Sequence, residues 1–358
     1  MLERSYLRRA AIPLSWALLF VSACSDDPPK PRPTTTTTTS TTTTTTSTTT
    51  TTVPTGPPAQ LTGLATTPEG ALRLLRPALA IKIDNSLEAM PQSGLNSADL
   101  VIELRVEGIS RLMTVFHSND SDLVGPTRSA RFSDPDVLAL FVKPLFGWSG
   151  ANDRVTPVVL GTPWIVNVHW NRAQKEYFRR PGRAAPHNLY TRTPALFAFA
   201  ESGQSPPVPI FDYIAVGQPP MVVLPVPGIA LSVGGTSSHW VWDAPSSSWL
   251  RWQYGRRHES EGAGQVSAAN VVVLETAYKD GKTSTAVTVG EGRAQVLTAG
   301  GIVEGRWSRP DRTQRFALTT ADGQPIVLTP GRTWIELTPG RTTGVISAET
   351  ASGLLAAG

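Results

Sequence analysis

The sequence is poor in the residues that build disulfide bonds and metal centres. Its 358 residues include one cysteine, Cys24, which excludes a disulfide framework, a multi-cysteine metal site and an iron–sulfur cluster. The five histidines show no H-E-x-x-H spacing, and neither a P-loop nor a G-x-G-x-x-G run is present. We therefore expect neither a metal nor a cofactor.

Long apolar runs are missing as well. The run at residues 10–21 follows a basic start and is too short for a comfortable membrane span of about 20 residues. It is typical of a signal peptide, which we place at residues 1–23. Residues 21–24, Val-Ser-Ala-Cys, resemble the bacterial lipobox, in which the cysteine thiol receives a diacylglyceryl group. This pattern predicts lipidation of Cys24 and a location on the extracytoplasmic face of the cell membrane.

The excess of positive charge is small. Lysine and arginine number 32 against 28 for aspartate and glutamate. Cleavage before Cys24 removes three arginines and one glutamate, which leaves 29 against 27, a balance of +2. So weak a field gives no reason to expect a nucleic-acid partner.

Residues 24–58 have the composition of a disordered stalk. Residues 34–52 comprise 17 threonines and two serines and contain no large apolar side chain, so they cannot offset the entropy of ordering. Fully extended, the stalk would reach on the order of 100 Å. It is either a bare linker or a site of O-glycosylation.

The sequence after the stalk divides into two domains. Residues 59–205 alternate β-rich runs with helix signals and predict an α/β or α+β domain. The expected strands are 79–84, 100–104 and 112–117, and the expected helices are 133–142, opened by Ser133 and Pro135, and 193–201.

The second half is different in character. Residues 206–228 are rich in proline and predict a connection. Residues 229–340 show short strand candidates separated by glycine turns, which predicts a mainly antiparallel β domain. We expect most of its tryptophans to lie in the core and His258-Glu259 to be a surface or turn feature. Residues 341–358 are predicted to be a flexible tail.

Several motifs occur together in a recognisable order. In the first half they are residues 84–85, 91–95, 98–103, 107–111, 125–131 and 186–190, and in the second half residues 252–258, 269–273, 305–307 and 331–335. Together they resemble the YerB-like lipoprotein family over most of residues 61–339. Trp242 and Glu259 depart from that family's pattern. The resemblance implies an envelope lipoprotein with two domains of unknown function and no established catalytic residues.

Arg128 and Arg131 form the charged motif that most specifically indicates a ligand-binding site. Two guanidinium groups three residues apart, close to the hydroxyls of Thr127 and Ser129, have the geometry to hold a carboxylate or a phosphate. The alternative is that they pair internally with Asp84, Glu103 or Glu107. Arg111, Asn85 and Arg183, which lie in or beside the motifs above, complete the candidate ligand-binding set together with His187.

His187 is also a candidate acid or base. Histidine shuttles protons near neutral pH, and the strand-borne acids Asp84 and Glu103 are the other candidates for this role. Convergence of these groups in one cleft would favour an enzyme, and scattered positions would favour a binding protein.

The expected function follows from the anchor, the stalk and the arginines. The leading hypothesis is a lipid-anchored, non-catalytic envelope protein that binds an anionic wall component, a wall precursor or a protein partner. The expected partners are the membrane through Cys24, peptidoglycan or another envelope polymer, and an envelope enzyme. The alternative is a wall-modifying hydrolase or transferase that uses His187 or a strand carboxylate.

Overall fold

The computed structural model describes residues 56–215, 218–281, 283–340 and 343–357. The predicted signal peptide, Cys24 and the threonine tract lie outside these ranges.

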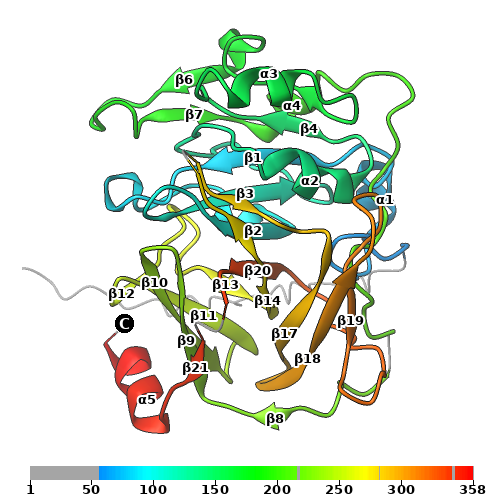
Figure 1. Cartoon of the computed structure of the whole chain (residues 1–358), viewed down its shortest axis with the longest axis vertical. Coiled ribbons are helices and arrows are strands. Elements are labelled where there is room, and N and C mark those ends of the chain that lie inside the picture. Colours follow the sequence, from blue (N-terminus) through cyan, green and yellow to red (C-terminus); the bar gives the residue numbers. More distant parts are fainter. Residues whose placement is uncertain (1–55, 216–217, 282, 341–342, 358) are drawn as a thin grey trace, which may run out of the picture. The chain divides into compact units, whose positions relative to one another are not determined.

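A mixed sheet forms the centre of the fold (Figure 1). Within the described ranges it has 11 strands, in the order β19-β18-β17-β14-β20-β2-β3-β1-β4-β5, with β8 paired to β18. Its strands from the first half are β1 (Leu79–Ile83), β2 (Leu100–Arg105), β3 (Ser110–Phe116), β4 (Leu145–Gly147) and β5 (Val166–Asn167). Those from the second half are β8 (Leu224–Pro225), β14 (Asn270–Glu275), β17 (Gly290–Thr298), β18 (Gly301–Arg309), β19 (Ala317–Thr319) and β20 (Thr333–Thr338).

The central strands β1, β2 and β3 are buried almost throughout, which is why they appear in the sequence as continuous apolar runs. β2 pairs in parallel with β20, so the two halves of the chain share one sheet. β1, β2, β4, β5, β14 and β20 all point the same way. Their carboxyl ends therefore lie at the same edge of the sheet.

The helices are short. They are α1 (Pro68–Arg73), α2 (Asp134–Leu138), α3 (Val155–Leu160), α4 (Thr193–Phe197) and α5 (Ala348–Ala356), with the 3-10 turns η1 (Leu87–Ala89), η2 (Leu95–Ser97), η3 (Ala139–Phe141) and η4 (Gln174–Glu176). None of the helices in the described ranges has the length and apolarity to span a membrane.

The helix at residue 133 differs in detail from its prediction. The α-helix begins at Asp134, ends at Leu138 and continues only as a 3-10 turn to Phe141. Ser133 does not cap it, because its hydroxyl accepts a hydrogen bond of 2.8 Å from the Ala286 amide in the second half. The helix cannot extend far, since Pro144 disfavours helical backbone in the residue before it.

A second sheet packs on one face of the first. Its order is β12-β11-β10-β9-β21, with β13 paired to β11. Its strands are β9 (Gly228–Val233), β10 (Thr236–Asp243), β11 (Ser248–Gln253), β12 (Arg256–Arg257), β13 (Ser267–Ala268) and β21 (Gly344–Val345). Trp240 and Trp249 share a hydrophobic cluster with Ile81 and Leu112 of the central sheet. These tryptophans are buried, which confirms the expectation that they form core.

Two hairpins lie outside these sheets. β6 (Tyr177–Arg179) pairs with β7 (Leu189–Thr191), and β15 (Tyr278–Lys279) pairs with β16 (Thr285–Ala286). The first half thus mixes strands with helices and the second half is mainly antiparallel, so the predicted fold class is confirmed.

The C-terminal segment differs from the predicted flexible tail. Its described residues form β21, which pairs with β9, and helix α5. Ser347 caps α5 by accepting a hydrogen bond from the Thr350 amide at 3.1 Å. Ala351 is buried against Val241 and Trp252. Ile346 and Leu354 pack against the same cluster, so a small apolar face anchors this segment.

Candidate functional site

Two polar clusters lie at the carboxyl ends of β1 and β2, on opposite faces of the central sheet. Successive strand residues point to opposite faces, so the neighbours Asp84 and Asn85 belong to different clusters. The "arginine cluster" comprises Asp84, Glu107, Arg111, Arg128, Arg131 and His187. The "buried network" comprises Asn85, Gln92, Glu103, Arg251, Gln253, His258 and Glu336.

Two arginines of the arginine cluster form ion pairs. Arg128 Nε lies 2.9 Å from Asp84 Oδ2, and Arg131 Nη2 donates to Glu107 Oε2 at 2.7 Å. Their side chains keep 25% and 12% exposure, respectively. Both arginines therefore have the internal partners foreseen in the alternative interpretation, while each remains accessible at one side.

Among the described residues, Arg111 forms no ion pair with a carboxylate. It is the second residue of β3, is 5% exposed, and donates a hydrogen bond of 3.2 Å from Nη1 to the Ser129 carbonyl. Its buried Nε has no hydrogen-bond partner within the described ranges. Burial, followed by the charge of Arg131, lowers the pKa of Arg111 to about 10, while the charge of Asp84 opposes the change.

The charges of the arginine cluster do not balance. Three guanidinium groups face two carboxylates, Asp84 and Glu107, which leaves one positive charge. The adjacent Lys82 is neutralised by Asp134 at 2.6 Å, with both side chains fully buried. A buried guanidinium without its full set of partners is costly. An anion bound here would supply the missing acceptor and the missing negative charge.

His187 is oriented by Asp84. Its Nδ1 lies 2.8 Å from Asp84 Oδ2 and 3.2 Å from Ser86 Oγ. Because a carboxylate accepts, Nδ1 carries the hydrogen in the neutral ring and Nε2 has the free lone pair. The side chain is 19% exposed. This is the geometry that a carboxylate-oriented general base requires.

The remaining predicted site residues have other surroundings. Arg183 donates to the carbonyls of Ala89 and Pro91 at 2.9 and 2.8 Å and so braces the loop that follows Asp84. Asn85 and Glu103 face the buried network. Asp84 and His187 thus converge with the arginines, whereas Glu103 does not.

The buried network joins the two halves of the chain. Arg251 Nη2 donates to Glu103 Oε2 at 2.7 Å, and Arg251 Nη1 lies 2.6 Å from His258 Nδ1. The guanidinium also lies 4.8 Å from the ring centre of Trp334. Glu103 and Arg251 are fully or almost fully buried.

His258 is inside the protein and not at a surface turn as expected. It is fully buried, and burial followed by the charge of Arg251 lowers its pKa well below the usual range. Arg251 can only donate, so Nδ1 accepts and Nε2 donates to Gln92 Oε1 at 2.8 Å. Gln92 in turn donates to Asn85, which links His258 back to β1.

Glu336 lies directly across from Glu103 in the β2–β20 pair. It is fully buried and accepts a hydrogen bond from Trp240 Nε1 at 3.0 Å, while its Oε2 has no partner among the described residues. Burial raises the pKa of Glu336 well above its usual range, and the charge of Glu103 raises it further. Two carboxyl groups and one guanidinium are best accommodated with Glu336 protonated.

Arg251, Gln92 and Glu336 were not predicted from the sequence as site residues. The sequence does contain a signal for Arg251. It lies in a strand pattern between Trp249 and Trp252, and Trp249, Arg251 and Gln253 occupy alternate positions of that strand. All three are buried on the same face.

The hollows of the surface are not centred on the arginine cluster, although one of about 460 Å³ touches it through Glu107. A hollow of about 490 Å³ is lined by Phe132, Asn152, Asp153, Arg154 and residues of the β15–β16 hairpin. Another, of about 320 Å³, touches the buried network through Gln253. We place the candidate site at the arginine cluster because its charge and unpaired donor indicate a ligand, whereas volume alone does not. The described ranges contain no group of three or more His, Cys, Asp or Glu residues arranged to hold a metal ion.

The fold and the site together define a class: a two-module protein in which an α/β half and an antiparallel β half share one sheet and are joined by a buried polar network. The chain belongs to the family described as protein of unknown function DUF3048, with the N-terminal domain at residues 61–205 and the C-terminal domain at residues 229–335. The resemblance seen in the sequence is thereby confirmed.

Two comparisons extend this result. The chain is 26% identical over 310 residues to a Bacillus subtilis (strain 168) protein named "Putative lipoprotein YerB", covering 81% of this chain and 88% of that one. It is also similar to the crystal structure of the YerB protein from Bacillus subtilis, with a TM-score of 0.70, 22% identity, and coverage of 81% of this chain and 99% of that chain. At this identity the structural likeness establishes the fold.

Proposed function

We propose that the protein is an envelope lipoprotein, anchored through Cys24 on the extracytoplasmic face of the membrane, that binds an anionic group of a wall component, a wall precursor or a protein partner. The observation that carries the binding role is Arg111, a buried guanidinium with an unpaired Nε beside two further arginines. The lipobox and the relative named as a lipoprotein support the anchor. The stalk gives the folded region room to work within the wall layer.

Removal of a cluster arginine tests the binding role. The full-length chain in neutral detergent is titrated with orthophosphate and with a purified muropeptide, which carries carboxylates. We expect Arg111→Gln and Arg128→Gln each to weaken binding by at least about ten-fold, because each removes a charge-assisted hydrogen bond.

Arg315→Gln is the matched control, since Arg315 is an exposed arginine paired with Asp212. Circular dichroism verifies that each variant is folded. Equal affinity in the wild type, both cluster variants and the control would exclude the arginine cluster as the binding site. If Arg111→Gln does not fold, Arg128→Gln alone tests the binding role of the arginine cluster.

The 2.8 Å contact between His187 and Asp84 favours a second candidate, a hydrolase or transferase of wall material. In that case His187 Nε2 removes a proton from water or a substrate hydroxyl, and the arginines orient the anionic substrate. We expect His187→Ala and Asp84→Asn to reduce turnover of isolated wall material by about 100-fold or more. Glu88→Gln, an exposed neighbour, is the control. No turnover by the wild type, or turnover unchanged in both variants, rules this candidate out.

A further inference from the structure

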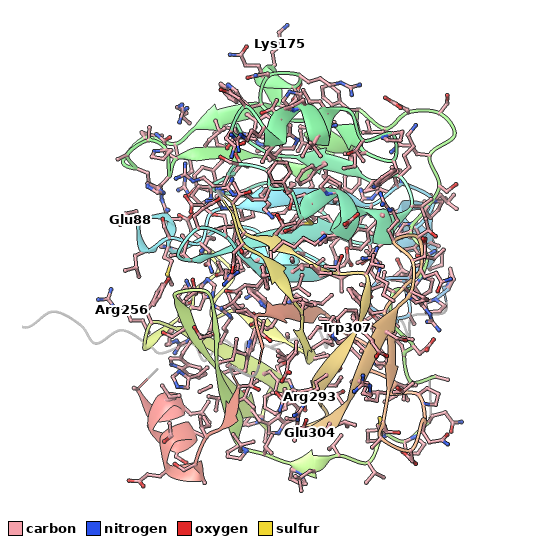
Figure 2. The ribbon with its side chains drawn as sticks, viewed as in Figure 1. Glu88, Lys175, Arg256, Arg293, Glu304 and Trp307 are labelled. Carbon is pink, nitrogen blue, oxygen red and sulfur yellow. The ribbon has the colours of Figure 1, made fainter. Side chains whose placement is uncertain are left out.

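The β6–β7 hairpin carries an unusual concentration of arginine. Residues 177–192 contain Arg179, Arg180, Arg183 and Arg192 and neither an aspartate nor a glutamate. The same segment, green in Figure 1, provides His187 of the arginine cluster. Lys175, which Figure 2 labels, and Glu176 directly precede β6 and carry opposite charges, so they add no net charge to the segment. The hairpin is therefore a positively charged extension of the candidate site.

The arginines on one face are held by aromatic rings. Phe178 and Tyr190 lie opposite each other in the hairpin, with ring centres 6.4 Å apart. Arg192 lies 4.5 Å from the centre of the Phe178 ring, and Arg180 lies 5.1 Å from that of Tyr190. Arg183 also lies over Tyr190, at 6.0 Å. Stacking on a ring fixes a guanidinium in place. Arg192 makes no side-chain hydrogen bond among the described residues, whereas Arg180 donates to Glu261 and Arg183 to backbone carbonyls.

Few carboxylates neutralise these groups. Arg180 pairs with Glu261, and this hydrogen bond lowers the pKa of Glu261. Arg179 donates to the Asn188 side chain and Arg183 to backbone carbonyls, as described above. Within the described ranges, Arg179, Arg183 and Arg192 form no ion pair.

The spacing fits a polymer better than a single anion. In the hairpin register Arg192 lies level with Glu176, with which it forms no ion pair among the described residues, and four positions from Arg180, or about 13 Å along the strands. One phosphate or carboxylate cannot span that distance. None of the large hydrophobic residues exposed in the described ranges belongs to the hairpin, so it lacks the apolar contact that surface binding to a bilayer requires.

We propose that the ligand is a linear polyanion of the envelope, and that it lies along the arginine–aromatic face of the β6–β7 hairpin with one anionic group in the arginine cluster. This deepens the proposed function and rests on it for the terminal contact at Arg111 and Arg128. The hairpin provides sequence-independent charge contacts, as basic grooves do for other polyanions.

The test compares a polymer with a monomer on the full-length chain in neutral detergent. The probes are long-chain polyphosphate and orthophosphate, and the variant is Arg180→Gln with Arg192→Gln. The control, Arg293→Gln with Arg306→Gln, changes the net charge equally at exposed positions of β17 and β18, where Figure 2 labels Arg293. A third variant, Phe178→Leu, removes a stacking ring without changing the charge.

We expect the hairpin variant to bind polyphosphate about ten-fold more weakly and to reduce the slope of log affinity against log salt by about 1 to 2. Orthophosphate binding is expected to stay unchanged, and Phe178→Leu to weaken polymer binding by a smaller factor. A control variant that loses as much affinity as the hairpin variant overturns the proposal, because charge alone would then explain binding.

Two further outcomes separate the proposals. Preference of the wild type for phosphatidylglycerol-containing micelles over polyphosphate would overturn the polymer assignment in favour of a lipid surface. If Arg128→Gln loses orthophosphate binding and the hairpin variant binds polyphosphate as the wild type does, the proposed function stands and the hairpin is excluded as the polymer-binding surface. If polyphosphate binding depends on the hairpin arginines and orthophosphate does not bind at all, the hairpin stands as the polymer-binding surface and the arginine cluster is excluded as an anion site.

Discussion

Replacement of Arg251 by methionine is expected to destabilise the folded protein by about 3–5 kcal/mol. Arg251 is buried, neutralises Glu103 at 2.7 Å and contacts His258. Methionine fills similar volume but leaves Glu103 as an uncompensated buried charge beside Glu336. Equilibrium unfolding in urea measures the change in the free energy of unfolding.

The surroundings of Arg251 provide both a control and a rescue. Arg257→Met on the neighbouring strand β12 removes an exposed pair with Glu259, for which we expect a change of at most about 1 kcal/mol. Addition of Glu103→Gln to Arg251→Met should recover part of the lost stability, because it removes the stranded charge. A loss below about 1 kcal/mol in Arg251→Met would contradict the structural role given to this network.

The stability of the wild type is expected to contain a component that falls as pH rises, owing to Glu336. Burial raises the pKa of Glu336 above its usual range in the folded state, so the folded protein holds a proton that the unfolded chain has released. The contribution of this proton is fully present below the unfolded pKa and is lost as pH rises through the folded pKa, with a slope of at most about 1.4 kcal/mol per pH unit.

Glu336→Gln isolates this component from other titrating groups. Glutamine keeps an acceptor for Trp240 Nε1 and cannot ionise. The free energy of unfolding of the variant minus that of the wild type should therefore increase from pH 5 to pH 8. Buried His258 has a lowered pKa, and its opposite pH dependence is common to both proteins and cancels in the difference. Glu304→Gln, at an exposed site on β18 labelled in Figure 2, is the control. A difference independent of pH would show that Glu336 is ionised in the folded protein.

Much of the fold could be read from local patterns. The apolar runs that became β1, β2 and β3 are visible because strands buried on both faces lack polar alternation. Proline next to Asp134 and at residue 194 marked helix starts correctly, since proline is tolerated in the first turn. The extent of these helices was overestimated, because residues after Leu138 and Phe197 serve tertiary contacts and turns.

The site was only partly predictable. Arg128, Asp84 and His187 were identified from residue type and motif, and the structure brings them together. Glu103 was assigned to the same group because it too is a strand-borne acid, but it lies level with Ile83 and not with Asp84, so it points to the other face. His258 looked like a turn residue because nothing local reveals that Gln92, 166 positions away, receives its hydrogen bond.

The sequence by itself determined the family, the strand runs, the presence of an arginine motif and the predicted anchor at Cys24, since each depends on residues close together in the chain. Only the tertiary structure decided that both halves share one sheet, that Asp84 and Asn85 separate onto two faces, and that Glu103 meets Arg251 and Glu336. The physical reason is that strand register and side-chain alternation are set by long-range pairing and burial, and a shift of one residue would exchange the two faces.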